Sequence, residues 1–241
     1  MPRSATGYGA TRKKMNDQQQ NPVEAFRLKY MSLTMRKVST QTRYRISMDD
    51  RDVYEMLKIA YSANVARCGY VFSEDAETQK KIHGMAGWLT SSKAKPGMLL
   101  CGTCGNGKTT LAESAREVIN TLLNPESSPN VIPHVPQMIR INALKITQAY
   151  TEQKGEYERW KVCPMLMIDD LGVEPAEIRV YGNVVSPLVE MLYERYDRKL
   201  MTVITSNLTK KAIGEVYGPR IVERVIEMCN IMAFTHKSYR K

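Results

Sequence analysis

The sequence predicts an α/β fold in which helices flank a five-stranded parallel sheet. From residue 97 onward, short apolar runs alternate with longer stretches of helical spacing. This alternation is typical of parallel strands that are joined by crossover helices. A glycine-rich loop at 102–109 stands between the first of these runs and the first of these helices, which is the place that a phosphate-binding loop takes in such a fold.

Five apolar runs are expected to form the strands of this sheet. They are residues 98–101, 138–141, 165–168, 200–205 and 231–234. Two of the segments between them show helical spacing of their apolar residues. The first holds Leu111, Ala115, Val118 and Leu122, and the second holds Val184, Leu188, Met191 and Leu192.

Two further helices are predicted ahead of the first strand. Ser47 and Asp50 form a capping pattern in front of an amphipathic segment that ends near Gly69, and this pattern indicates a helix start. A second helix is expected over residues 77–90. We assign both helices to a core domain, residues 48–241.

Residues 1–47 are expected to form a basic, partly disordered arm. They hold ten Lys and Arg against two acidic residues, a net charge of +8 out of +10 for the whole chain. Such an arm suits the phosphate backbone of nucleic acid, although a solvated tail is the alternative. Asn21 and Pro22 indicate the start of one amphipathic helix. Its apolar face would hold Phe26, Tyr30 and Leu33, and residues 39–47 read as a linker.

Composition narrows the class of protein. The 241 residues are 43% hydrophobic and 25% charged, which favours a packed core. No run approaches the roughly 20 apolar residues that cross a bilayer, and no apolar segment of a secretory signal follows the basic N-terminus. The five cysteines have irregular spacing, which indicates a reducing compartment. We therefore expect a cytoplasmic protein with no membrane partner.

The loop at 102–109 satisfies the P-loop pattern and predicts an ATP site. Its residues are Gly102, Thr103, Cys104, Gly105, Asn106, Gly107, Lys108 and Thr109, and Thr110 follows as a further nucleotide contact. Glycines allow backbone N–H groups to wrap the phosphates, and the N-terminus of the next helix adds a favourable dipole. Lys108 is expected to reach the β and γ phosphates, and the Thr109 hydroxyl is expected to hold Mg²⁺.

A second element follows at Met165–Asp170, where an apolar run ends in two aspartates. Ligands of open α/β sheets bind at the carboxyl ends of the strands. We therefore expect Asp169 to hold Mg²⁺ through water and Asp170 to orient or deprotonate the attacking water.

Two further groups complete the predicted site. Asn207 follows the run at 200–205 and would contact the γ-phosphate or position the water, unless it caps the next helix. Arg220 and Arg224 share one helix face, and Arg240 lies near the chain end. Arginines stabilise the charge of phosphoryl transfer, but exposed helices also carry them.

Five segments together resemble the AAA+ ATPases of the DnaC and IstB group. They are GTCGNGKTTL (102–111), MLMIDDLGVEP (165–175), ITSNLT (204–209), YGPRIVERV (217–225) and IMAFTHKSYR (231–240). The likeness covers residues 65–241. It implies that Asn207 is sensor I, that Arg224 is an arginine finger acting on a neighbour's ATP, and that Arg240 is a sensor II-like residue. Tyr70 and Val71 lie where this family forms its adenine pocket.

The resemblance also implies a function. DnaC-type members place the replicative helicase on single-stranded DNA, whereas IstB-type members direct a transposase. We expect an oligomeric ATPase that assembles on single-stranded DNA and loads or remodels a hexameric helicase. Hydrolysis is expected to be slow because Asp170 stands where most AAA+ proteins have Glu. The chain ends after Ser238-Tyr239-Arg240, so no separate helical lid is expected.

Three alternatives to a helicase-loading ATPase are considered. A transposase is the alternative partner, and a nucleotide-gated adaptor with negligible turnover is the alternative activity. A small-molecule kinase fits less well, since paired arginines suit an intersubunit site.

Tyr150, Tyr157 and Trp160 would either stack DNA bases or pack inside the domain as part of a helix.

Overall fold

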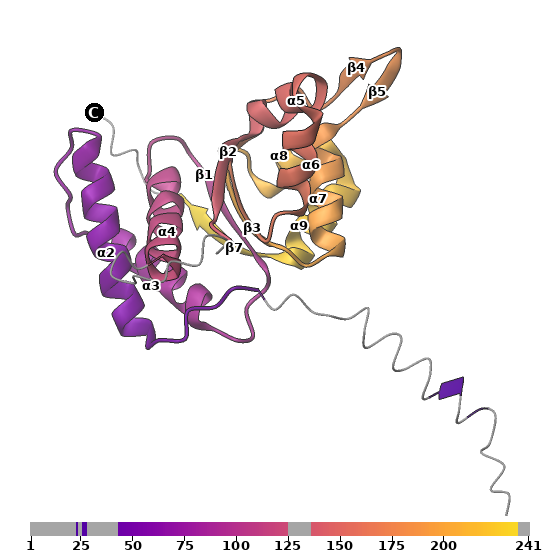
Figure 1. Ribbon diagram of the computed structural model, residues 1–241. Coiled ribbons are helices and arrows are strands. Elements are labelled where there is room, and N and C mark those ends of the chain that lie inside the picture. The colour runs from indigo at the N-terminus through magenta and orange to yellow at the C-terminus, as the bar shows by residue number, and fades with distance from the viewer. Residues whose placement is uncertain (1–22, 24–25, 28–42, 125–135, 236–241) are drawn as a thin grey trace, which may run out of the picture. The chain divides into compact units, whose positions relative to one another are not determined.

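The computed structural model describes residues 23, 26–27, 43–124 and 136–235 (Figure 1). The chain divides into two compact units, residues 1–40 and 41–241. In the first unit Val23, Phe26 and Arg27 are helical. Asn21, Pro22, Tyr30 and Leu33, which complete the predicted arm helix, lie outside the described residues. The domain boundary after residue 47 stays a prediction.

A five-stranded sheet forms the centre of the second unit, and every pair of neighbouring strands is parallel. Its order is β2-β3-β6-β1-β7. The strands are β1 (Gly97–Gly102), β2 (Ile139–Asn142), β3 (Met165–Leu171), β6 (Met201–Ser206) and β7 (Cys229–Phe234). The five predicted strands and their parallel arrangement are therefore confirmed.

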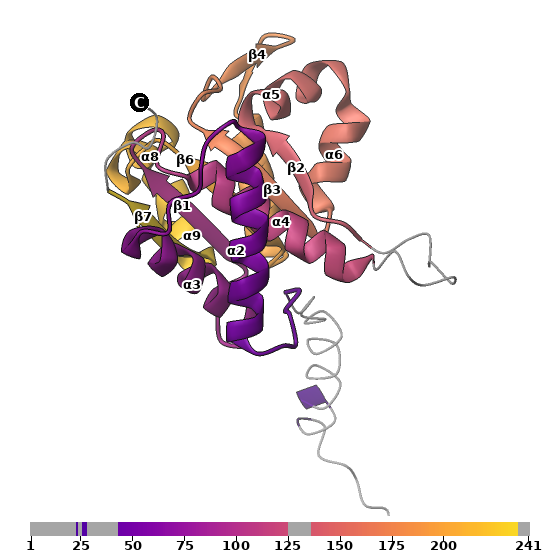
Figure 2. The ribbon, with the colours of Figure 1, turned by 90° about the vertical axis from the view of Figure 1, so that its left-hand side faces the viewer.

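Helices cover both faces of this sheet (Figures 1 and 2). On one face lie α2 (Asp50–Arg67), α3 (Ala76–Thr90) and α4 (Lys108–Leu123). The other face carries α5 (Ala143–Glu152), α6 (Lys154–Val162), α7 (Pro187–Asp197), α8 (Lys210–Tyr217) and α9 (Pro219–Met228). Within the described part of the chain, no helix is long and apolar enough to span a membrane.

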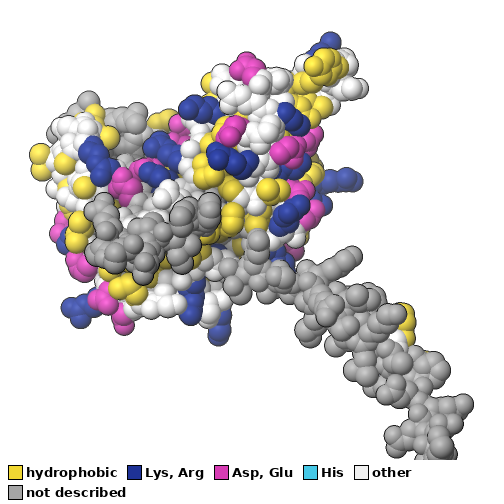
Figure 3. Space-filling model, viewed as in Figure 1, with side chains coloured by type: hydrophobic (Ala, Val, Ile, Leu, Met, Phe, Trp, Pro, Cys, Tyr) yellow, Lys and Arg dark blue, Asp and Glu magenta, His cyan; other side chains and the backbone are white. Residues whose placement is uncertain are grey.

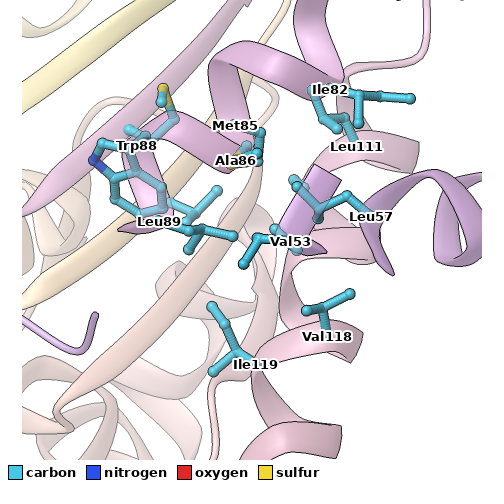
Figure 4. Packing of buried hydrophobic residues seen from close by; sticks show 14 of the residues in the cluster. Val53, Leu57, Ile82, Met85, Ala86, Trp88, Leu89, Leu111, Val118 and Ile119 are labelled. Atoms are coloured by element: carbon cyan, nitrogen blue, oxygen red, sulfur yellow. The ribbon is translucent and has the colours of Figure 1, made fainter. Parts of the chain in front are cut away.

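The alternation of side chains along β1 joins the two layers. Met98 and Leu100 belong to the core beneath α2, α3 and α4, whereas Leu99 and Cys101 belong to the core beneath α5–α9. Successive strand residues point to opposite faces, and a sheet that is covered on both sides is apolar at each position. Figure 4 shows the first core, where side chains of α2, α3 and α4 interdigitate.

Two predictions at the start of the core domain need correction. The N-cap of α2 is Asp49, whose side chain accepts a hydrogen bond from the Arg51 amide at 2.9 Å, so Ser47 is not the cap. The predicted linker also packs on the domain over its described part. Ile46 is buried, its amide donates to the Leu89 carbonyl at 3.0 Å, and the Arg43 guanidinium lies 4.6 Å from the Trp88 ring centre.

A hairpin replaces the start of the helical segment that was predicted to run from Val184 to Leu192. Strands β4 (Ile178–Val180) and β5 (Asn183–Val185) pair in antiparallel fashion as a separate two-stranded sheet. Tyr181 and Gly182 both have positive φ, 49° and 84°, as a tight type I′ turn requires. Val184 therefore lies in a strand, and the helix begins only at Pro187, a residue suited to the first turn. The hairpin projects from the body (Figure 1), and Figure 3 shows hydrophobic side chains beside a basic one at its end.

One buried cation ties the layer of α5–α9 to the sheet. Arg195 of α7 is 0% exposed, and its guanidinium donates to the carbonyls of Trp160, Cys163 and Met201 at 2.8–3.0 Å. It also donates to the Thr202 hydroxyl at 2.9 Å. Burial lowers the pKa of Arg195 to about 10, so the group stays charged at neutral pH. Its charge is satisfied by the partial negative charge of these oxygens.

We expect Arg195→Met to lower the free energy of unfolding by about 3 kcal/mol, because it leaves buried carbonyls without donors. Arg198→Met next to the end of the same helix is the control, since the Arg198 side chain is 56% exposed and its loss should cost less than about 1 kcal/mol. Urea unfolding followed by circular dichroism measures both. Equal destabilisation by the two variants would contradict this account of the buried guanidinium.

Candidate nucleotide-binding site

A pocket of about 670 Å³ opens where β1, β3 and β6 end. Ligands of parallel α/β sheets bind at this edge, and the volume is in the range of small-molecule sites. The residues that line the pocket fall into three groups. They are the end of α2 with the segment after it, the loop at 104–110, and the side chains Arg140, Asp169, Asp170, Val173 and Asn207.

The base of the P-loop is fixed to the last strand. The amide of Thr103 and the side-chain amide of Asn106 both donate to the Phe234 carbonyl, at 3.2 and 3.1 Å. A Cβ atom on Gly102 would lie 2.0 Å from the same oxygen, so only glycine fits there. Gly102 and Thr103 thus anchor the loop, and the loop from Cys104 to Thr110 faces the pocket.

Gly107 makes the turn from the loop into α4. Its φ of 88° is left-handed, and a Cβ there would lie 2.3 Å from the Tyr61 hydroxyl. As the N-cap of α4, Gly107 provides no side-chain hydrogen bond to the first turn. The first amides of a helix and its dipole favour negative charge at this point. This arrangement suits a phosphate group.

Lys108 lies inside the loop that it is predicted to serve. Its Nζ donates to the carbonyl of Gly102 at 3.1 Å, to the carbonyl of Thr103 at 2.5 Å and to Asn106 Oδ1 at 3.2 Å. The side chain is buried, and these acceptors are neutral. The ammonium group thus lies within the loop that is predicted to wrap the phosphates.

Asp169 lies buried among hydroxyl groups. Its Oδ1 accepts hydrogen bonds from Thr109 at 3.0 Å and from Thr205 at 2.7 Å, and its Oδ2 accepts one from Arg140 at 2.6 Å. Thr109 belongs to α4, Thr205 to β6 and Arg140 to β2, so one carboxylate joins the P-loop helix to two neighbouring strands.

Asp170 follows Asp169 in an irregular part of the strand. The pairing of β3 with β6 shifts register between Ile168 and Leu171, and Asp170 has a φ of 58°. Non-glycine residues rarely adopt this conformation, and strained residues often lie at functional sites. The Asp170 amide donates to the Thr205 hydroxyl at 2.9 Å. Asp170 is thereby held among the residues that line the pocket.

The oxygen ligands fit a hard divalent cation. The Thr109 hydroxyl and the Asp169 carboxylate lie 3.0 Å apart, and both are ligands that Mg²⁺ accepts. No cluster of three or more His, Cys, Asp and Glu occurs in the described ranges. An ion held by Thr109 and Asp169 would take its remaining ligands from water and from nucleotide phosphates, as Mg²⁺ usually does.

The predicted sensor and arginine residues lie in different places. Asn207 is exposed and lines the pocket, and α8 is capped by Thr209 rather than by Asn207. Arg224 does not line the pocket of its own chain, and its guanidinium lies 4.2 Å from the Tyr193 ring centre. Arg220 is exposed. Arg240 lies outside the described residues.

Tyr70 and Val71, the predicted adenine residues, line the pocket together with Tyr61 and Phe72. The rings of Tyr61 and Phe72 meet edge to face at 5.6 Å. Aromatic and apolar side chains of this kind suit a flat, apolar group.

Tyr157, one of the predicted DNA-stacking residues, is wholly buried. Its ring meets that of Tyr150 at a centroid distance of 5.0 Å, and its hydroxyl donates to the Pro187 carbonyl at 2.9 Å. Packing within the domain therefore explains Tyr157, as the alternative interpretation of the sequence had it.

Sequence patterns did not single out Arg140, Thr205 or Glu174. Arg140 and Thr205 stand within apolar runs, where they read as parts of strands, and Glu174 follows the two aspartates in a segment without clear periodicity. Each of the three contacts residues that are distant in sequence, so a local sequence pattern does not predict its role in the site.

Glu174 fixes the loop that follows Asp170. It is buried, and burial raises its pKa. One of its oxygens accepts from the Gly172 amide at 3.0 Å, and the other accepts from the Tyr217 hydroxyl. This pair of contacts ties the loop after β3 to the end of α8.

Comparisons with known proteins agree with this architecture. The family model of IstB-like ATP binding proteins matches residues 14–241. Among curated proteins no sequence matches. The crystal structure of DnaI has 19% identity and a TM-score of 0.50, with 68% of this chain and 87% of that chain covered.

Two further solved structures are similar. A candidate primosome component from Streptococcus pyogenes serotype M3 has 20% identity and a TM-score of 0.50, with 70% of this chain and 84% of that chain covered. The DnaC helicase loader has 17% identity and a TM-score of 0.49, with 68% and 93% covered. The family match spans most of the chain, and the sheet and its P-loop have the AAA+ arrangement. The chain therefore belongs to the family of IstB-like ATP-binding proteins, within the DnaC and IstB group of AAA+ ATPases.

Proposed function

We propose that this protein hydrolyses ATP, assembles on single-stranded DNA and loads or remodels a replicative hexameric helicase. The observation that carries the ATPase part is the convergence of five side chains on one pocket. They are Lys108, Thr109, Asp169, Asp170 and Asn207. Family membership supports nucleotide binding, and the separate roles below are our proposal.

Each side chain has a distinct task in this proposal. Lys108 binds the β and γ phosphates, while Thr109 and Asp169 hold Mg²⁺, which neutralises phosphate charge when it is bound. Asp170 orients the attacking water and accepts its proton. Asn207 positions the same water or the γ-phosphate. Because aspartate is one methylene shorter than the usual glutamate, we propose slow turnover that DNA or a partner stimulates.

The arginines belong to an interface between subunits in this proposal. Arg224 is stacked on Tyr193 and lies outside the pocket of its own chain, which supports a role on a neighbour's nucleotide. Arg240 would act as the sensor II-like residue. Self-association of the chain then completes each site.

The proposal of DNA and a helicase as partners is based on the sequence. Residues 1–47 carry most of the net positive charge, which favours a polyanion, and the motifs resemble those of DnaC-type loaders. A transposase is the second candidate partner, because the family model that matches is the one for IstB-like proteins. A pull-down with the tagged protein and ATP distinguishes them by whether helicase or transposase is recovered.

Lys108→Ala should weaken ATP binding by about 2 kcal/mol, roughly 30-fold, because a charged hydrogen-bond donor is lost. Asp170→Asn should leave ATP affinity nearly unchanged and lower turnover by ~100-fold, as expected for a general base. Nucleotide titration and steady-state phosphate release measure the two effects. Normal hydrolysis by Asp170→Asn would remove Asp170 from its proposed role.

Arg224→Ala should lower turnover by ~1000-fold with little change in ATP affinity, because an arginine finger acts mainly in the transition state. Mixing this variant with Lys108→Ala should restore part of the activity, since one mixed interface joins an intact pocket to an intact finger. Arg198→Ala, directly after α7, is the matched control. With all variants folded, failure to rescue at each mixing ratio would exclude a shared site.

Deletion of residues 1–40 should weaken binding of single-stranded DNA while ATP affinity stays unchanged. The cut is placed before Arg43 and Ile46 because both pack on the core domain. The segment carries eight Lys and Arg against two acidic residues, so its contribution should fall steeply as salt rises. Fluorescence anisotropy at low and moderate salt measures it. Equal DNA affinity of the two proteins at low salt would place DNA binding on the core.

A further inference from the structure

Arg140 enters the nucleotide pocket from the edge strand of the sheet. In the parallel pairing of β2 with β3, Arg140 lies opposite Met167, and Asn142 lies opposite Asp169. Arg140 therefore lies two residues below the carboxylate in the sheet, and its side chain extends up to it. Asn142 lies directly opposite Asp169, but its side chain caps α5 by accepting a hydrogen bond from the Leu144 amide.

The guanidinium of Arg140 lies between two carboxylates. Its Nη2 donates to Asp169 Oδ2 at 2.6 Å, and its Nη1 is 3.4 Å from Glu113 Oε2. The Asp169 and Glu113 side chains are 5% and 14% exposed, whereas that of Arg140 is 41% exposed. The two acids are thus fixed and nearly buried, and the arginine between them has room to move.

Glu113 offers the arginine a second ion pair. It stands on α4 and is bound by Arg116 through Nε at 3.0 Å and Nη2 at 2.6 Å. Burial raises the pKa of Glu113, but Arg116 and Arg140 outweigh it and leave the pKa below its usual value. The acid therefore stays ionised at neutral pH. Arg140 is able to stay paired with Glu113 when it loses Asp169.

The contact with Asp169 conflicts with the proposed role of that carboxylate. Oδ1 already accepts from Thr109 and Thr205, and Oδ2 is taken by a cation. A divalent ion held by Thr109 and Asp169 would meet a guanidinium at short range, and like charges repel. Without the metal, the same guanidinium offsets the repulsion between Asp169 and the phosphates.

We propose that Arg140 is a positioning residue that holds Asp169 until nucleotide arrives with its metal, and then pairs with Glu113 alone. The inference rests on the proposed ATP and Mg²⁺ site. Arg140 and the metal neutralise the same Asp169 charge. When either one is present, nucleotide binding depends less on the other. Arg140 therefore lowers the dependence of nucleotide binding on Mg²⁺.

The measured quantity is the Mg²⁺ dependence of nucleotide affinity. Binding of a non-hydrolysable ATP analogue to the full chain is titrated in EDTA and in excess Mg²⁺, and the dissociation constant in EDTA is divided by that in Mg²⁺. Arg140→Gln should raise this ratio at least ~5-fold, because Asp169 then repels the free nucleotide and accepts the metal more readily. Arg116→Gln, which keeps the Asp169 contact, should leave the ratio within ~2-fold.

Glu113→Gln provides a second test with the opposite sign. Without the alternative ion pair Arg140 is held by Asp169 alone, so the ratio should fall below that of the unaltered protein. A ratio in Arg140→Gln equal to that in Arg116→Gln, or a rise in Glu113→Gln, would overturn the inference while the nucleotide site stands. Absence of analogue binding by the unaltered protein in both conditions would overturn the site and the inference together.

Discussion

The hydrogen bonds around the Asp169 carboxylate join the parts of this site. Asp169 ends the apolar part of β3, and its Oδ1 accepts from Thr109 of the P-loop helix and from Thr205 of the adjacent strand β6. Thr205 in turn accepts from the Asp170 amide. A buried carboxylate is costly unless it is paired and hydrogen-bonded. The same contacts that stabilise this charge therefore set the relative positions of β3, β6 and α4.

The rest of the fold supports this arrangement from both sides. Phe234 at the end of β7 holds the base of the P-loop through Thr103 and Asn106, and Arg195 ties α7 to the start of β6. Both contacts use backbone carbonyls at the ends of strands. These contacts hold the sheet at its edge strand β7 and at the start of its central strand β6. The loop amides that this support holds in place favour a negatively charged ligand.

Local patterns predicted the strands, the P-loop and the acidic strand end, because each depends on neighbours in sequence. The features that were missed depend on contacts distant in sequence or on an unusual conformation. Thr205 and Arg140 reach Asp169 only through the pairing of β6 and β2 with β3. The hairpin was missed because Tyr181 adopts a positive φ that tyrosine rarely takes. Ser47 and Asp49 offer the same capping chemistry two residues apart, and only the structure shows that Asp49 is the cap.

The most direct measurement is the thermal unfolding of the full chain and of Asp169→Asn, each with ATP in EDTA and with ATP plus Mg²⁺. A ligand that binds only the folded state at 100 times its dissociation constant stabilises it by ~2.7 kcal/mol. We expect Mg²⁺ to raise the melting temperature of the ATP-bound unaltered chain further, and Asp169→Asn to lose this additional rise. An equal response to Mg²⁺ in both proteins would contradict the central place of the Asp169 carboxylate.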